Sequence, residues 1–220
     1  YIVCGSVSTG DYLTWDMIHT LQSQGHDIQA HTMTHAHSNV LSQTRLNYEY
    51  GQSLPCLTNN GTSGVHMVAM PFNEGFNNAT VINTISNSYD MARGGNDPTF
   101  FLRCDNFATS TQADCTTFKS PGVLNFFNKY SIRSWSHDLA TISTNYNDGQ
   151  SFSKFLEVVN AATTNTSSNS TEVPIIYYHR VVLDNGPSST SEYKGTTTTL
   201  LDAEMKYLAD NNFKILTTKN

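Results

Sequence analysis

The stretch that decides the fold of this chain is GHDIQAHTMTH, residues 25–35. A predicted amphipathic helix over 14–24 ends at Gly25, a residue suited to the position just past a helix, and a predicted strand follows over 26–30. His31 and His35 therefore stand directly after a strand. Since α/β folds place their chemistry at the carboxyl ends of strands, this order predicts an α/β fold with a functional site at residues 31–35.

The spacing of His31 and His35 allows two imidazole nitrogens to reach one metal ion, and neutral imidazole is a common zinc ligand. Zinc peptidase helices also carry two histidines four residues apart, but Glu follows the first one, whereas Thr32 stands there in this chain. The sequence therefore predicts a divalent metal, zinc, without a peptidase base. The alternative is that both histidines are hydrogen-bonded surface residues.

Strands and helices are predicted to alternate along the rest of the chain, which favours a parallel sheet or barrel. The predicted strands are 1–5, 65–70, 89–93, 131–135 and 175–178. The predicted helices are 42–54, 78–85 and 151–162, and 122–130 is predicted to be a helix or a long turn. Ser42 and Asn78 are the predicted caps of their helices. The strand 175–178 is the most apolar and is predicted to be the most buried. Residues 94–121 are predicted to be an irregular insertion at the rim.

Length and composition predict one domain and exclude some partners. The chain has 220 residues, a net charge of −6 and only 14% charged residues. This charge disfavours nucleic acid, which requires a basic face. No apolar run approaches the roughly 20 residues that span a bilayer. The abundance of uncharged polar residues is typical of secreted and cell-surface proteins. The start of the chain within a predicted strand suggests a truncated or mature fragment.

The cysteines and the glycosylation sequons favour an extracellular protein. Cys104 and Cys115 would close a short polar loop as a disulfide, while Cys4 and Cys56 either form a second bridge or stay reduced. N-glycosylation acceptor sequons lie at Asn60, Asn78, Asn165 and Asn169.

Three stretches together resemble a known family: residues 25–35, VPIIYYHR at 173–180, and the closing segments 200–208 and 212–217. In this order they resemble the polysaccharide deacetylases of the NodB-homology type, carbohydrate esterase family 4. The stretch RSWSHD at 133–138 is similar to that of extracellular deacetylase-like proteins of ammonia-oxidising archaea. The resemblance covers almost the whole chain. It implies a distorted (β/α)7-type barrel whose first strand is missing from this chain, with 200–208 as the last helix and 212–217 as the last strand.

The resemblance also implies roles for particular residues. His31 and His35 would bind the divalent metal, and His179 would be the general acid. Asp138 stands where the family has a carboxylate beside its aromatic wall, and it would orient His179. The implied activity is metal-dependent hydrolysis of N-acetyl groups on an extracellular or cell-wall polysaccharide, with the protein in a possible cell-surface assembly.

Substrate contacts are implied for Pro71 and Phe72, which lie in MPFN at 70–73, and for Trp135. The family carries Arg-x-Pro-Tyr at the place of MPFN. Pro71 therefore matches the motif, and the arginine is absent. Phe72, or Phe76 nearby, either supports a sugar ring or belongs to the core. His37 is predicted to be a solvated loop residue, and His137 has no assigned role.

One family motif has no counterpart in this chain. The Thr-Phe-Asp-Asp strand, which supplies the general base and the third metal ligand, is expected upstream of Tyr1. Without it, the alternative is an inactive deacetylase-fold domain that binds carbohydrate or serves as a cell-surface structural protein. An esterase that removes O-acetyl groups would use the same site.

Overall fold

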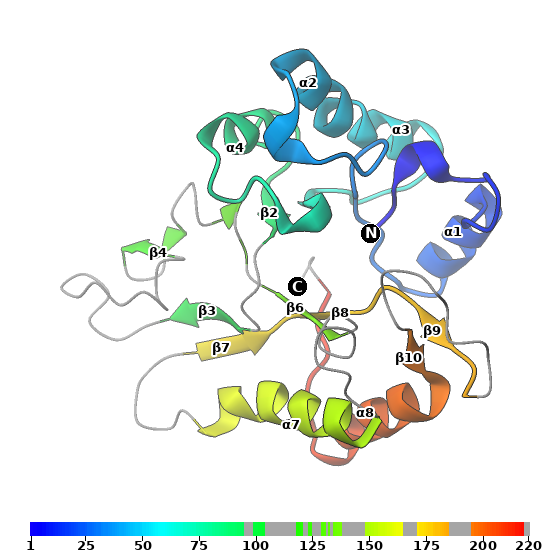
Figure 1. The fold of residues 1–220 in the computed structure, drawn as a ribbon, viewed down its shortest axis with the longest axis vertical. Helices are drawn as coiled ribbons and strands as arrows, with labels where there is room; N and C mark the ends of the chain where they lie inside the picture. Colours follow the sequence, from blue (N-terminus) through cyan, green and yellow to red (C-terminus); the bar gives the residue numbers. More distant parts are fainter. Residues whose placement is uncertain are drawn as a thin grey trace. The chain divides into compact units, whose positions relative to one another are not determined.

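The computed structural model describes residues 1–94, 99–103, 118–120, 123–124, 129–130, 132, 134–137, 148–164, 171–184 and 195–217, which form helices and short strands (Figure 1). The chain divides into two compact units. The first comprises Tyr1–Gly95, Leu124–Ile132 and Leu216–Asn220, and the second comprises Asn96–Val123 and Arg133–Ile215. Each unit is described by itself, and the expectation of a single domain stays a prediction.

The described helices are α1 (Trp15–Ser23), α2 (Gln43–Gly51), α3 (Ser53–Asn59), α4 (Ala79–Ile85), α7 (Asp148–Thr164) and α8 (Thr198–Asp210), with 3-10 turns at Cys4–Ser6, Ser38–Val40 and Pro71–Asn73. The described strands are β1 (Met67–Ala69), β2 (Met91–Arg93), β3 (Thr99–Arg103), β4 (Phe118–Ser120), β5 (Val123–Leu124), β6 (Trp135–Ser136), β7 (Thr171–Pro174), β8 (Ile176–Tyr177), β9 (Val181–Val182) and β10 (Thr196–Thr197). No helix among the described residues has both the length and the apolar character needed to cross a membrane.

Local signals place the helices of the first unit. The Ser42 and Asn78 side chains accept hydrogen bonds from backbone N–H groups in the first turns of α2 and α4, which confirms both predicted caps. Gly25 adopts φ of 93° just past α1, as its place in the sequence predicts. The helix predicted over 42–54 is instead the pair α2 and α3. Pro55 explains the break, because proline lacks an N–H and is tolerated only in the first turn of a helix.

The strands of the first unit follow one another in chain order and are all parallel. Single bridges join Ile2 to Ala30 and Ala30 to Val68, β1 pairs with β2, and Arg93 is bridged to Ile132. Sequential parallel pairing is how a β/α barrel is built, so the α/β prediction is confirmed. The described residues form no closed sheet, and the barrel stays a prediction. The predicted strands at 1–5 and 26–30 are reduced to single bridges.

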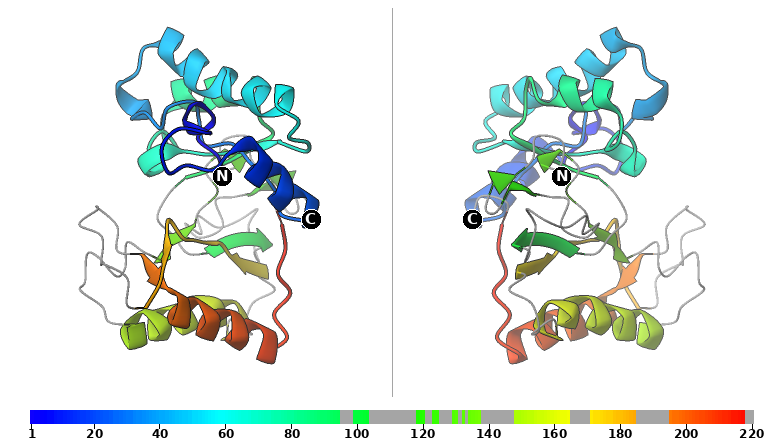
Figure 2. Two further views of the ribbon diagram at one scale, coloured as in Figure 1. Left: turned by 90° about the vertical axis from the view of Figure 1, so that its right-hand side faces the viewer. Right: turned by 90° about the vertical axis from the view of Figure 1, so that its left-hand side faces the viewer.

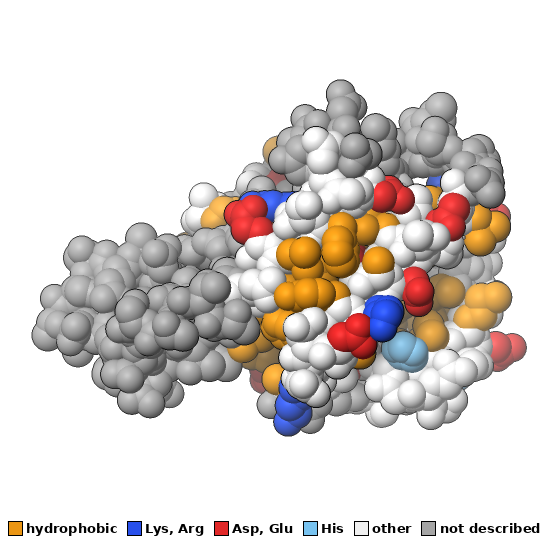
Figure 3. Space-filling view, turned by 90° about the horizontal axis from the view of Figure 1, so that it is seen from below, with side chains coloured by type: hydrophobic (Ala, Val, Ile, Leu, Met, Phe, Trp, Pro, Cys, Tyr) orange, Lys and Arg blue, Asp and Glu red, His pale blue; other side chains and the backbone are white. Residues whose placement is uncertain are grey.

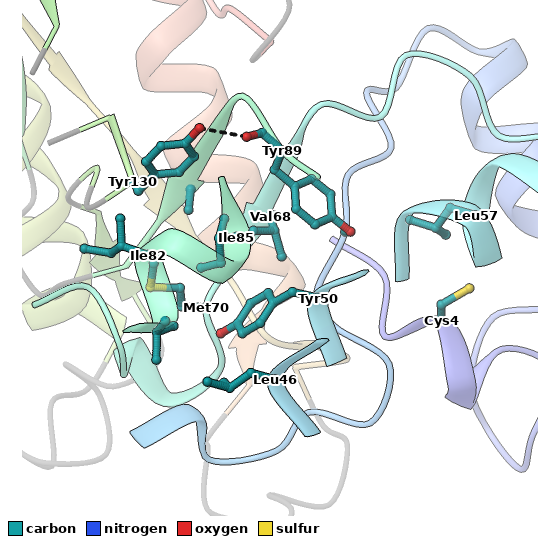
Figure 4. Packing of buried hydrophobic residues seen from close by; sticks show 13 residues of the cluster. Cys4, Leu46, Tyr50, Leu57, Val68, Met70, Ile82, Ile85, Tyr89 and Tyr130 are labelled. Atoms are coloured by element: carbon teal, nitrogen blue, oxygen red, sulfur yellow. Dashed lines mark hydrogen bonds between the residues drawn. The ribbon is translucent and has the colours of Figure 1, made fainter. Parts of the chain in front are cut away.

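The core of the first unit lies between these strands and α2, α3 and α4 (Figure 4). Its buried members are Cys4, Ala30, Leu46, Tyr50, Leu57, Val68, Met70, Val81, Ile82, Ile85, Tyr89, Ala92 and Tyr130. The Tyr130 hydroxyl donates to the Tyr89 carbonyl at 2.9 Å, the bond drawn in Figure 4. Cys4 and Cys56 form a disulfide, which decides between the two states open to them in the sequence.

The second unit pairs α7 with α8, which lie side by side in both views of Figure 2. Phe155, Val159 and Leu208 form its buried cluster, and the Asn160 amide is 2.9 Å from the Tyr207 hydroxyl across the two helices. Seen from below, this part of the molecule presents hydrophobic side chains among charged ones (Figure 3). β6 pairs with β8 and β9 with β10, in both cases parallel.

Several predictions are wrong in this part of the chain. Residues 94–121 include β3, which pairs antiparallel with the distant β7. Val123–Leu124 is a strand rather than the start of a helix or long turn. The strand at 176–177 is only partly buried, whereas β1 is buried along its whole length. Residues 213–217 form no strand, and Ile215 is 69% exposed, because this segment pairs with no described strand.

Candidate functional site: the His31–His35 turn

His31 leaves the sheet directly after Ala30, which is bridged to neighbours on both sides. The His31 backbone N–H donates to the Ile2 carbonyl at 2.8 Å, and its Nδ1 lies 2.8 Å from the Ala69 carbonyl oxygen. A carbonyl only accepts, so Nδ1 carries the proton and Nε2 keeps its lone pair. A backbone carbonyl on the non-ligating nitrogen is the usual way in which proteins orient a metal-binding imidazole.

Burial is the main cause that lowers the pKa of His31 to about 3; the Ala69 hydrogen bond opposes this shift, and the nearby His35 and Arg93 contribute to it. The ring is therefore neutral at physiological pH. Because metal ligation requires the neutral imidazole, His31 is in the protonation state that a ligand needs.

His35 comes to the same place through a turn. The two imidazole rings lie edge to face with their centroids 4.7 Å apart, so the structure brings the predicted pair together. Thr32 and His35 adopt φ of 65° and 59°, both left-handed, and the Thr32 hydroxyl oxygen accepts the His35 backbone N–H at 3.1 Å. The turn, rather than a helix, sets the relation of the two rings.

The donor set fits a divalent metal in part. Two neutral imidazoles are two of the three protein ligands that a catalytic zinc uses. Among the residues that the structure describes, no group of three or more His, Cys, Asp or Glu side chains could hold a metal ion. The site as described therefore supplies a ligand pair.

An aromatic contact borders the pair. Pro71 is buried, and Phe72, with φ of 57° and 38% of its surface exposed, lies edge to face with His35 at 4.6 Å between ring centroids. His37 stacks on Phe72 at 3.7 Å, and its Nδ1 lies 2.9 Å from a Glu74 carboxylate oxygen. His37 is exposed, as predicted, but it is held by both partners.

Three of the predicted site residues, His179, Trp135 and Asp138, belong to the second unit, and their surroundings are given within that unit only. His179 is exposed and contacts the Tyr177 ring at 5.3 Å between centroids. Trp135 is partly buried and lies edge to face with His137 at 5.3 Å. Asp138 lies outside the described residues. The roles of these three residues stay predictions.

His137, without a role in the sequence, is fully buried in the second unit. Its Nε2 lies 2.6 Å from Glu204 Oε1, and its Nδ1 lies 3.0 Å from the Thr196 hydroxyl. The other Glu204 oxygen accepts the Tyr178 hydroxyl at 2.7 Å. This network ties the residues that follow β6 and β8 to α8.

Sequence reasoning missed two residues around the turn. Arg93 lies one residue beyond Ala92 on β2, as His31 does beyond Ala30, so alternation along the strands places both side chains on the face opposite the helices. The Arg93 guanidinium is buried and lies 5.1 Å from the Tyr1 ring centroid. The period-two pattern could have found Arg93. Glu49 is the other residue, and no motif points to it.

Of the remaining predicted sites, the structure describes two glycosylation sequons. Asn60 is exposed, and its side-chain amide donates to the Cys56 carbonyl at 2.8 Å. Asn78 caps α4 through its side-chain oxygen. Asn165, Asn169, Cys104 and Cys115 lie outside the described residues. Glycosylation stays a prediction at all four sequons.

Comparison with known proteins supports the sequence resemblance over part of the chain. The family model described as Polysaccharide deacetylase matches residues 2–92, the segment that holds the His31–His35 turn and Phe72. A search of curated proteins finds no match. The archaeal similarity stays a prediction.

Two solved structures are similar to the chain. One is a protein from Bacillus anthracis described as polysaccharide deacetylase BA0330, with 19% identity and a TM-score of 0.45 over 60% of this chain and 36% of that one. The other is BC0361, a polysaccharide deacetylase from Bacillus cereus, with 18% identity and a TM-score of 0.44 over the same shares. The match thus spans about a third of the length of either relative.

Proposed function

We propose that this protein is a polysaccharide deacetylase that hydrolyses N-acetyl groups with the help of a divalent metal, zinc, held by His31 and His35. The observation that carries the proposal is the His31 ring. Its Nδ1 is held by the Ala69 carbonyl, which leaves Nε2 as the ligand atom. The centroid of the ring lies 4.7 Å from that of a second imidazole, His35. This pair lies in the segment that matches the deacetylase family model.

Each residue has a stated part in the proposal. His31 and His35 hold the metal, which when bound supplies Lewis-acid polarisation of the acetyl carbonyl and activation of water. Phe72, 38% exposed, offers an aromatic surface beside the pair against which the apolar face of a sugar ring can pack. His179 is proposed as the proton donor to the leaving amine.

Metal content is the first measurement. Elemental mass spectrometry of the purified protein is expected to find a divalent metal, zinc, that is lost in the double variant His31→Ala/His35→Ala. A matched control is His37→Ala/His66→Ala, which removes two imidazoles outside the proposed ligand pair. Equal metal in the wild type and in the His31/His35 variant would overturn the proposed site.

The substrate is tested by acetate release from N-acetylglucosamine oligomers and from an O-acetylated glycan. Acetate released from the first, and lost with the His31/His35 substitutions, supports the deacetylase. Release from the second alone identifies an esterase. Binding of the oligomers without acetate release favours the alternative, a carbohydrate-binding or cell-surface structural domain. The observation in favour of this alternative is that the described residues supply two ligands rather than three.

We propose an extracellular or cell-surface location on the basis of the Cys4–Cys56 disulfide. Disulfides persist in oxidising compartments and are rare in the cytosol. Fractionation of the native host, followed by detection of the protein in the medium or cell wall, tests this. Its recovery only from the cytosol would contradict the location.

A further inference from the structure

Glu49 on α2 is a buried carboxylate that binds the middle of the His31–His35 turn. Its side chain is 1% exposed. Oε2 accepts the Thr34 backbone N–H at 2.7 Å, and Oε1 accepts the Thr34 hydroxyl at 2.6 Å. The Glu49 backbone carbonyl accepts the Met33 N–H at 3.1 Å. One residue of α2 therefore satisfies both backbone donors between Thr32 and His35.

The turn needs such support because its backbone is strained. Thr32 and His35 both lie in the left-handed region, with φ of 65° and 59°. A non-glycine residue there costs on the order of 1–3 kcal/mol, and such a conformation persists only where the surroundings over-determine it. The turn begins at His31 and ends at His35, so its conformation decides where the two imidazoles lie relative to each other.

The carbonyl groups of the turn are held by the backbone of the 3-10 turn Cys4–Ser6. The Cys4 N–H donates to the Thr32 carbonyl at 3.1 Å, and the Gly5 N–H donates to the Met33 carbonyl at 2.9 Å. A Cβ at residue 5 would lie 2.5 Å from that Met33 oxygen, so the close approach requires glycine. The turn is thus fixed between Gly5 and Glu49.

Arg45 stabilises the buried carboxylate of Glu49 by pairing with it. Its guanidinium lies 3.0 Å from Oε1 of Glu49, one helical turn away on α2, and also donates to the Thr34 hydroxyl at 3.2 Å. Charge-assisted hydrogen bonds of this kind are roughly twice as strong as neutral ones. Glu49 is therefore held in place from within α2 as well as by the turn that it binds.

We propose that Glu49 is the positioning residue for the His31/His35 metal site: it binds the Thr34 amide and hydroxyl and so fixes the distance between the two imidazoles. This inference rests on the proposed function, because it takes the pair as the metal ligands. Glu49 does not touch the metal or the substrate. It acts only through the turn.

The test is a calorimetric titration of the full chain with zinc alone. Glu49→Gln keeps the shape of the side chain but loses the charge and one acceptor, and we expect the zinc affinity to fall about 10–100-fold. The visible absorption of bound cobalt, which reports ligand geometry, should change in the same variant. A purely structural role would lower the urea midpoint while leaving both the affinity and the cobalt spectrum of the folded protein unchanged.

A second pair of variants covers the case in which Glu49→Gln does not fold. Thr34 is exposed, so Thr34→Val removes its hydroxyl bond to Glu49 without disturbing the core, and Thr34→Ser keeps that bond. Thr34→Val should weaken zinc binding about tenfold relative to Thr34→Ser. Glu157→Gln, on the exposed face of α7, is the matched control and should bind zinc as the wild type does.

The outcomes separate the two claims. Wild-type zinc affinity in folded Glu49→Gln, or equal affinity in the two Thr34 variants, overturns the inference and leaves the proposed function standing. A wild-type chain that binds neither zinc nor cobalt overturns the proposed metal site, and the role of Glu49 with it. Weakened binding in Glu49→Gln and Thr34→Val, but not in Glu157→Gln, supports both.

Discussion

Thr32 combines a left-handed backbone with a buried side chain that closes the turn. Its φ is 65°, which β-branched residues rarely adopt, and its hydroxyl oxygen accepts the His35 N–H at 3.1 Å. Thr32→Val keeps the shape but removes this acceptor, so we expect the free energy of unfolding to fall by about 1–3 kcal/mol. Urea denaturation measures this change. Thr32→Ser, which keeps the oxygen, should lose less, and equal stability of the valine and serine variants would contradict the argument.

Tyr89 gives the stability of the first unit a dependence on alkaline pH. Burial raises the pKa of Tyr89 to about 12, against the opposing effect of its hydrogen bond with Ser53 at 2.6 Å. In the unfolded chain the Tyr89 hydroxyl loses its proton near pH 10. Its contribution to the free energy of unfolding is therefore complete below pH 10 and is lost as the pH rises through about 12.

Tyr89→Phe removes one titrating hydroxyl and should reduce this dependence. Between pH 8 and pH 11 the wild type should lose about 1 kcal/mol more unfolding free energy than the variant does. Urea unfolding of both proteins at the two pH values measures the difference. If both lost the same amount, the alkaline sensitivity would have another source.

At the residue scale, the sequence predicted the ligand pair but not what holds it. His31 and His35 could be found because their spacing and their place after a strand are local properties. Glu49 could not, because its role arises only where α2 approaches the turn in three dimensions. Phe72 could be placed by motif, but its left-handed φ and its contact with His35 depend on tertiary packing.

At the scale of elements, helices were easier to predict than strands. The caps Ser42 and Asn78 mark helix starts within a few residues of sequence, and both were confirmed. A strand depends on a partner that is distant in the chain, so the antiparallel pairing of β3 with β7 left no local signal. Burial of a strand depends on what covers both faces, which is why the apolar run at 175–178 is only partly buried.

The buried carboxylate of Glu204 joins three elements of the second unit. It accepts from His137, which follows β6, and from Tyr178, which follows β8, while itself lying on α8. Glu204→Ala leaves both donors without this acceptor, and we expect a loss of about 3–5 kcal/mol of unfolding free energy. Thermal or urea unfolding measures it. Glu157→Ala, an exposed carboxylate on α7, is the control and should change stability by less than about 0.5 kcal/mol.

At the scale of the whole molecule, alternating elements predicted the α/β class, and the parallel, sequential strand order of the first unit confirms it. The division into two compact units was not predicted. Alternation of strands and helices is a property of neighbouring segments, whereas the grouping of segments depends on contacts between distant ones. The pairing of β3 with β7, over 99–103 and 171–174, is such a contact.

The Cys4–Cys56 disulfide is the covalent constraint of the first unit, and its energetic effect can be predicted. It ties the 3-10 turn Cys4–Ser6 to α3 across 52 residues of chain. In the chain-entropy model, closing a loop of this length destabilises the unfolded state by about 4 kcal/mol. Cys4→Ser/Cys56→Ser should therefore lower the free energy of unfolding by about 2–5 kcal/mol.

Urea denaturation of the oxidised wild type and of the double variant tests this, with mass-spectrometric mapping of the Cys4–Cys56 peptide before unfolding. Because Cys4 is only 4% exposed, a mild reductant should leave the bridge intact in the folded protein and cleave it once urea opens the core. Reductant should then lower the wild-type urea midpoint towards that of the double variant. The opposite result is the same urea midpoint for the oxidised wild type, the reduced wild type and the double variant. It would show that the core alone fixes Cys4 against α3, and the argument for an oxidising compartment would lose its support.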